Sequence, residues 1–192
     1  MKVALFFGSF NPIHNGHTQL AEYLIDNELT DEVWFVISPC NPLKSQFELL
    51  DEYVRLDMLM LAIVHEPKFK ACDIEFDLAT PSYTIETLHA LSAQYSDYQF
   101  TLLIGSDNAL VFDKWKCPQQ ILTEYPVMVY PRSGYDFSQV TNLYPQMQLL
   151  HSPCFDISST QIRTALTQKK DVSNWLHPSV FQFIVDNELY DS

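Results

Sequence analysis

The sequence predicts an α/β fold with a Rossmann-like, doubly wound parallel sheet. Short β-rich runs recur along the chain, stretches of helical spacing separate most of them, and 192 residues suffice to bury one sizeable core. No internal repeat or linker-like change in composition indicates a second domain. The expected strands lie at 3–7, 33–37, 69–74, 100–104 and 127–130.

Helical spacing indicates where the helices lie. Leu20 and Leu24 mark one face of a helix at about 17–28. A second helix, at about 51–64, is apolar nearly all round, so we expect it to be buried. The other expected helices are one that carries Tyr83, Leu88 and Leu91, and two near the carboxyl end, at 159–168 and 178–189.

The last part of the chain shows no confident strand between its two helices. We therefore expect residues 1–192 to form one domain, with an α/β core at about 1–150 and a C-terminal helical extension at about 151–192. Parallel sheets bind ligands at the carboxyl ends of their strands, near the point where the strand order reverses. The loops after the strands are therefore the expected place of a functional site.

Composition restricts the partners. With 24 acidic against 11 basic side chains, the net charge of −13 argues against binding a nucleic-acid polymer, which requires clustered cations. The longest apolar run, 58–64, is too short to cross a membrane. Four scattered cysteines without a CxxC pair are typical of reduced thiols, so we expect a cytoplasmic protein. No pattern in the chain predicts an oligomeric state.

The stretch "FFGSFNPIHNGH", at 6–17, follows the first expected strand directly. Gly8 and Ser9 let the backbone turn and leave amide hydrogens for a ligand. The start of the next helix would present unpaired N–H groups, which suit a phosphate. His14 and His17, three residues apart, would project beside it and donate hydrogen bonds to phosphate oxygens, more strongly if protonated.

Two other interpretations of these histidines stay open. His17 shares a helical face with Leu20 and Leu24, which also suits a hydrogen-bonded core histidine. His14 and His17 could instead form a metal pair. Zinc sites usually add Cys, Asp or Glu ligands, however, and none lies in this loop.

The stretch "DISSTQIR", at 156–163, offers a second helix start. Ser158 and Gln161 fit a capping box, so a well-capped helix is one explanation. Ser159 and Thr160 would add further hydroxyls, and Arg163 would add a guanidinium that fits phosphate oxygens. Two such helix starts side by side would hold a triphosphate between them.

These residues carry a family resemblance. "GSFNPIHNGH" resembles the (T/H)xGH signature of the nucleotidyltransferase superfamily in its HxGH form, and "ISSTQIR" resembles the ISSTxIR element of the same superfamily. Within it, nearly the whole chain is similar to the bacterial type of nicotinate and nicotinamide mononucleotide adenylyltransferases. Further matches are "NPLK" (41–44), "RLDMLMLA" (55–62), "PSYTIETL" (81–88), "LIGSDN" (103–108), "FDKW" (112–115) and "FIVDNELY" (183–190).

The resemblance implies transfer of the adenylyl group of ATP to nicotinate mononucleotide in NAD biosynthesis. Deamido-NAD and pyrophosphate would form by in-line attack without a covalent intermediate. Mg²⁺ would arrive with ATP, because it binds mainly through phosphate oxygens and water, and no metal site of the protein itself is expected. The implied catalytic residues are His14, His17 and Arg163.

The resemblance also assigns the two substrates to residues of this chain. Trp115 would stack on the pyridine ring, Tyr83 and Thr84 would read its substituent, and Lys44 and Arg132 would hold the mononucleotide phosphate. The implied ATP-binding residues are Gly8, Ser9, Phe10, His14, His17, Gly105, Asp107, Ser158, Ser159, Thr160 and Arg163.

Simpler roles for some of these residues stay open. Asp107 could be a plain helix cap, Trp115 a core aromatic, and Lys44 and Arg132 solvated surface charges. Many relatives carry a histidine where this chain has Leu43, so a role for such a histidine is lost here. The "RLDMLMLA" stretch receives no chemical role. Alternative functions are a phosphopantetheine adenylyltransferase, a cytidylyltransferase, or a nucleotide sensor without turnover.

Overall fold

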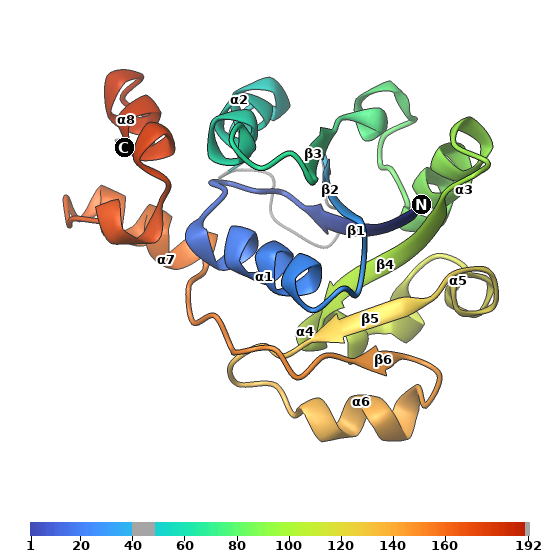
Figure 1. Cartoon of the computed structure of the whole chain (residues 1–192). Coiled ribbons are helices and arrows are strands. Elements are labelled where there is room, and N and C mark those ends of the chain that lie inside the picture. The colour runs from blue at the N-terminus through green and yellow to red at the C-terminus, as the bar shows by residue number, and fades with distance from the viewer. Residues whose placement is uncertain (40–48, 191–192) are drawn as a thin grey trace.

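A computed structural model describes residues 1–39 and 49–190. At its centre lies one sheet of six parallel strands (Figure 1). The strand order is β3-β2-β1-β4-β5-β6. This order reverses between β1 and β4, so the loops after these two strands flank the expected ligand site. The strands are β1 Lys2–Gly8, β2 Glu32–Ile37, β3 Phe69–Cys72, β4 Gln99–Gly105, β5 Val127–Tyr130 and β6 Gln148–Leu149.

Helices cover both faces of this sheet (Figure 1). The α-helices are α1 Asn15–Asp26, α2 Glu52–Ile63, α3 Thr84–Gln94, α4 Ser106–Ala109, α5 Pro118–Glu124, α6 Phe137–Leu143, α7 Ser159–Thr167 and α8 Pro178–Asp186. Short 3-10 helices lie at Ile74–Asp77, Phe112–Lys114 and Ser173–Trp175.

Alternate side chains of each strand bury the two faces of the sheet in separate cores. In β1, Ala4 and Phe6 join the hydrophobic cluster that includes buried residues of α1 and α2, whereas Val3 and Leu5 join the cluster that includes α3. Buried residues of α7 and α8 belong to the first cluster, and α8 packs against α2. The C-terminal helices therefore share a core with the sheet.

The α/β class, the parallel sheet and all five expected strands are confirmed. The third strand ends at Cys72 rather than 74, because Ile74 begins a 3-10 helix. The expected elements did not include β6, which has only two residues and therefore no periodic pattern. Within the described ranges, no helix combines the length and the apolar character needed to span a bilayer.

The expectation that α2 is buried on all sides is wrong. Met58 and Leu59 are fully buried, but Tyr53 and Met60 are 61% and 55% exposed. The helix contacts the sheet along one face, and α8 covers only part of the remainder. The apolar residues of α2 therefore include some that face solvent, on the side of the helix away from the sheet.

Arg55, near the start of α2, is fully buried. It donates hydrogen bonds to four backbone carbonyl oxygens, those of Ser9 (2.7 Å), Ser38 (2.9 Å), Leu50 (2.9 Å) and Pro39 (3.1 Å). Because Ser9 follows β1 and Ser38 follows β2, one guanidinium connects the loops at the carboxyl ends of two neighbouring strands to α2.

Replacement of this guanidinium is expected to destabilise the whole fold. Arg55→Met would leave four buried or partly buried carbonyl oxygens without their donor, and we expect a loss of about 3 kcal/mol or more in the free energy of unfolding, measured by urea denaturation. The matched control is Lys68→Met on the exposed surface, with an expected change within about 0.5 kcal/mol. Equal urea midpoints for Arg55→Met and the wild type would contradict this role.

Candidate active site

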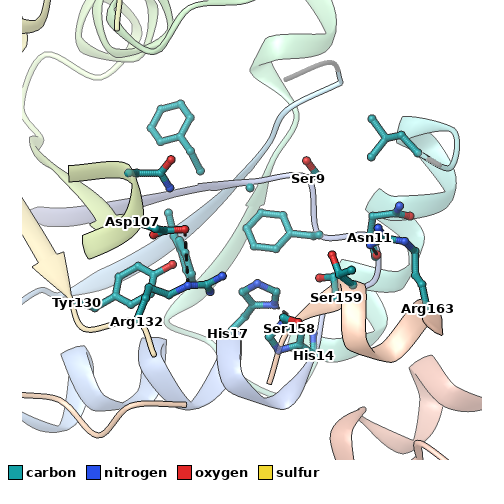
Figure 2. Close-up of a pocket in the computed structure, with 17 residues that line it drawn as sticks. Ser9, Asn11, His14, His17, Asp107, Tyr130, Arg132, Ser158, Ser159 and Arg163 are labelled. Atoms are coloured by element: carbon teal, nitrogen blue, oxygen red, sulfur yellow. Dashed lines mark hydrogen bonds and ion pairs between the residues drawn. The ribbon is translucent and has the colours of Figure 1, made fainter. Parts of the chain in front are cut away.

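A cavity of about 400 Å³ opens at the carboxyl ends of β1, β4 and β5 (Figure 2). Its walls come from the loop after β1, the start of α1, the segment after β4, the loop after β5 and the start of α7. The volume lies in the range of small-molecule sites. The two motif stretches that the sequence singles out thus meet at one cavity, at the point where the strand order reverses.

The loop after β1 is held by residues far away in the sequence. Arg163 donates to the carbonyl oxygen of Asn11 (3.0 Å), and Ser159 donates to that of Pro12 (2.9 Å). The hydroxyl of Tyr190 donates to the side-chain oxygen of Asn11 (2.7 Å). The first turns of α7 and the end of the chain therefore fix the loop that precedes α1.

Gly8 and Phe10 explain the tight course of this loop. A Cβ atom on Gly8 would lie 2.9–3.2 Å from the ring of Phe10, so a larger residue would push this ring away. Phe10 has φ 45°, and its ring is buried against Phe6 and His17, with centroids 5.7 Å and 5.1 Å apart. The side chain of Phe10 thus packs in the core, and the residue also lines the cavity.

His14 and His17 stack on each other at the start of α1, with ring centroids 3.6 Å apart. Nδ1 of His17 accepts the backbone N–H of His14 (3.2 Å), so the neutral ring of His17 carries its proton on Nε2. His17 also packs on Phe6 and Phe10, as the core interpretation expects. It nevertheless lines the cavity and is only half-buried, which gives its ring access to a ligand.

His14 is 4% exposed. Burial, assisted by the positive charge of Arg132, lowers the pKa of His14 to about 3. The imidazole is therefore neutral at pH 7, in contrast to the protonated form that the sequence allowed. Because the rings of His14 and His17 are stacked, a positive charge on one ring would disfavour protonation of the other.

At the start of α7, the predicted capping box is present. Ser158 Oγ accepts the N–H of Gln161 (3.2 Å), and the N–H of Ser158 donates to Oε1 of Gln161 (2.9 Å). Ser158, Ser159 and Thr160 all line the cavity, together with Arg163. The cap and a place at the cavity wall are therefore compatible, and Figure 2 shows these serines close to the histidine pair.

The opposite wall carries Asp107 and Arg132, with Nε of Arg132 at 3.8 Å from Oδ2 of Asp107 (Figure 2). Gly105 is the N-cap of α4, so Asp107 is not the cap of this helix. A Cβ on Gly105 would collide with the carboxylate of Asp107, which explains the glycine. Burial raises the pKa of Tyr130, beside them, to about 12, so its hydroxyl stays protonated.

A second cavity, of about 300 Å³, adjoins the first. Tyr83, Thr84 and Trp115 line it, so three of the residues implied for the mononucleotide come together there. Arg132 lies instead at the larger cavity. Lys44 belongs to a stretch outside the described residues. The walls that both cavities share include Phe6, Phe7, Gly8, Ser9, Asp107, Asn108 and Tyr130.

Buried polar atoms without a partner concentrate in this pair of cavities. Within the described chain, these atoms are Oγ of Ser9, Nδ1 of His14, Oδ1 of Asp107, Nε1 of Trp115 and Oγ of Ser152. All except Ser152 belong to residues that line the two cavities. Since buried polar groups in proteins almost always have a partner, bound water or a polar ligand would satisfy these atoms.

The sequence did not reveal several residues that shape the site. Arg55 received no role, and Asn11, Tyr130 and Tyr190 were not among the candidates. A signal for Arg55 existed, because it is one of only three arginines in the chain and lies in an apolar helix.

Among the residues that the structure describes, no group of three or more His, Cys, Asp and Glu side chains could hold a metal ion.

Comparison with known proteins places the chain in a family. Residues 5–165 match the cytidylyltransferase-like family model. A Bacteroides fragilis protein named "Probable nicotinate-nucleotide adenylyltransferase" is 46% identical over 96% of this chain and 91% of its own length. A Cytophaga hutchinsonii protein of the same name is 41% identical over the full length of both chains.

The fold is also found in solved structures. Plasmodium falciparum nicotinic acid mononucleotide adenylyltransferase complexed with NaAD has a TM-score of 0.82, with 22% identity over 99% of this chain and 97% of that one. The same enzyme complexed with APC has a TM-score of 0.81. The sequence matches and the fold together show that this chain belongs to the cytidylyltransferase-like family, among the nicotinate-nucleotide adenylyltransferases.

Proposed function

We propose that the protein transfers the adenylyl group of ATP to nicotinate mononucleotide, which gives deamido-NAD and pyrophosphate in NAD biosynthesis. One observation carries the proposal: a cavity rich in donors for phosphate shares a wall with a cavity lined by Trp115 and Tyr83. The names of the relatives point to the same reaction.

The triphosphate of ATP would lie in the larger cavity, between the starts of α1 and α7. The hydroxyl groups of Ser158 and Ser159 already donate to Gln161 and Pro12. The donors for the β- and γ-phosphates would therefore be the backbone N–H groups of the first turn of α7, the hydroxyl of Thr160 and the guanidinium of Arg163. Oδ1 of Asp107, a buried acceptor, would bind a ribose hydroxyl.

Nicotinate mononucleotide would occupy the second cavity. Its ring would stack on Trp115, whose other neighbour is Phe112 at a centroid distance of 5.1 Å. Tyr83 and Thr84 would contact the ring substituent. The phosphate would point to the wall that the two cavities share and toward Arg132 in the larger cavity, which brings it next to the α-phosphate of ATP.

The reaction requires no nucleophile from the protein. An oxygen of the mononucleotide phosphate attacks the α-phosphorus of ATP, and the bond from this phosphorus to the oxygen that bridges to the β-phosphate breaks. Pyrophosphate leaves with the electron pair of that bond. Catalysis of this kind depends on the placement of both reactants and on donors directed at the oxygens that gain charge.

His14 and His17 would supply such donors as neutral rings. The proton on Nε2 of His17 follows from the hydrogen bond at its Nδ1, and the low pKa of His14 keeps that ring neutral. A neutral imidazole donates without a proton transfer, so the pair would stabilise charge at the α-phosphate across the neutral pH range.

Mg²⁺ that arrives with ATP fits the residues present. Asp107 is the carboxylate of the larger cavity in the described chain, and it already faces Arg132. Mg²⁺ prefers oxygen ligands and retains water, so the phosphate oxygens would provide most of its ligands. When bound, Mg²⁺ would neutralise part of the negative charge of the ATP phosphates. Arg163 and the amide groups of the α7 start would orient the same phosphates.

The direct test is product formation. Purified protein with Mg-ATP and nicotinate mononucleotide should release pyrophosphate and form deamido-NAD, measured by chromatography. A panel with nicotinamide mononucleotide, phosphopantetheine and CTP separates the other superfamily activities. Binding of ATP without pyrophosphate release from any acceptor would favour a sensor and would overturn the proposal.

The role of His17 separates catalysis from structure. His17→Ala should lower kcat per folded molecule about a hundredfold or more, because a donor to the developing charge is lost. The melting temperature should fall as well, because the ring packs on Phe6 and Phe10. His89→Ala, an exposed histidine paired with Glu124, is the control and should retain full activity. Lost stability with normal turnover per folded molecule would support the core-histidine interpretation instead.

The burial of His14 predicts a pH-dependent stability. Its pKa is about 3 in the folded protein and about 6.5 unfolded, so only the unfolded state binds the proton between these values. Stability from this residue is present above pH 6.5 and falls as the pH drops toward 3. At pH 5 the wild type should lose about 2 kcal/mol more than His14→Gln, relative to pH 7, in urea denaturation. Parallel pH curves for the two proteins would refute the shift.

A further inference from the structure

Glu75, in the 3-10 helix after β3, is a buried carboxyl group with a 3% exposed side chain. Both of its oxygens accept hydroxyl hydrogen bonds, Oε2 from Ser82 (2.7 Å) and Oε1 from Thr87 (2.7 Å). Glu75 and Ser82 line the cavity that also contains Trp115. Both oxygens of the Glu75 side chain thus act as acceptors of hydroxyl groups.

No cation of the described chain balances this carboxylate. Ion pairs join Arg132 to Asp107 and Lys116 to Glu86, and none of those found joins Glu75 to a basic side chain. Lys114 and Lys116 also line the cavity, but both are exposed. A buried carboxylate without a cation is rare because the loss of hydration is costly. Its position at a ligand cavity points to a cation on the ligand.

We infer that Glu75 is the counter-charge of a quaternary pyridinium ring and selects a cationic ring over a neutral ring of the same shape. The inference rests on the proposed function, because nicotinate mononucleotide carries a permanent positive charge on its ring nitrogen. A ring stacked on Trp115 in a cavity of about 300 Å³ lies only several ångströms from every wall. Because the Glu75 side chain itself is buried, its attraction for a charge on the ring is screened less than that of a surface carboxylate.

Glu75 also has a structural role, which the experiment must separate from its charge. Ser82 and Thr87 flank the loop of Tyr83 and Thr84, so loss of the carboxylate would disturb the cavity wall. Glutamine at position 75 keeps this framework, because its oxygen accepts from one hydroxyl and its amide nitrogen donates to the other. Glu75→Gln therefore removes the charge and retains the contacts.

Nicotinamide mononucleotide and its reduced 1,4-dihydropyridine form are suitable probes, since they have similar shape and only the oxidised ring is cationic. We would measure the Kd of each by calorimetry, with a non-hydrolysable ATP analogue present. The wild type should bind the oxidised form more tightly, and Glu75→Gln should reduce this preference about tenfold. Thr87→Val, which loses one hydroxyl but keeps the charge, should retain the preference of the wild type.

Three results would overturn the inference. The first is a wild type that binds the oxidised and the reduced mononucleotide equally well, or binds neither. The second is an unchanged preference for the oxidised form in Glu75→Gln, and the third is an equal loss of this preference in Thr87→Val, which would mean that Glu75 acts through the loop. Failure of the proposed function is a separate result. It would appear as absence of dinucleotide formation by the wild type in the turnover assay, whatever the ratio of the two Kd values.

Discussion

The site depends on one constraint: side chains from distant segments bind the backbone carbonyl oxygens of Ser9, Asn11 and Pro12 in the loop after β1. Ser9, Asn11 and Pro12 each direct a carbonyl to a side-chain donor, from Arg55, Arg163 and Ser159 respectively. A carbonyl oxygen that faced a polyphosphate would repel it, but these three oxygens accept hydrogen bonds from side chains of the protein. In the same peptide unit, N–H and C=O point in opposite directions, so the N–H of Phe10 points away from Arg55. The loop can thus direct an amide toward an anion while these three carbonyl oxygens are bound to the protein.

This constraint also explains why the C-terminal helices belong with the sheet. The donors come from α2, from α7 and, through Tyr190 at the side chain of Asn11, from the end of the chain. Since α8 packs on α2, the helix that carries Arg55 is itself held by the segment that leads to Tyr190. The histidine pair stands at the end of this loop, so its position depends on contacts that span almost the whole sequence.

The fold and the two motif stretches were predictable because each is a local pattern. Apolar runs gave the five longer strands, and the spacing of His14 and His17 and the capping box at Ser158 follow from a few adjacent residues. What could not be predicted depends on contacts between distant segments. The burial of Arg55, the exposure of Met60, the place of Arg132 at the larger cavity and the low pKa of His14 all result from neighbours that local spacing does not specify. Lys44 lies outside the described residues, so its role stays a prediction.

The protein has a net charge of −13, yet both proposed substrates are anionic. The positions of its few cationic side chains therefore matter more than their number. All three arginines of the chain contact or line the site, one beneath the loop after β1 and two at the larger cavity. Acidic groups elsewhere matter little, because salt screens exposed charges beyond about 10 Å. The second cavity has a different character, with aromatic walls and the buried carboxylate of Glu75. Under the proposed function, the two halves of the site would complement two kinds of charge, phosphate in one and a cationic ring in the other, and this separation would orient a mononucleotide that carries both.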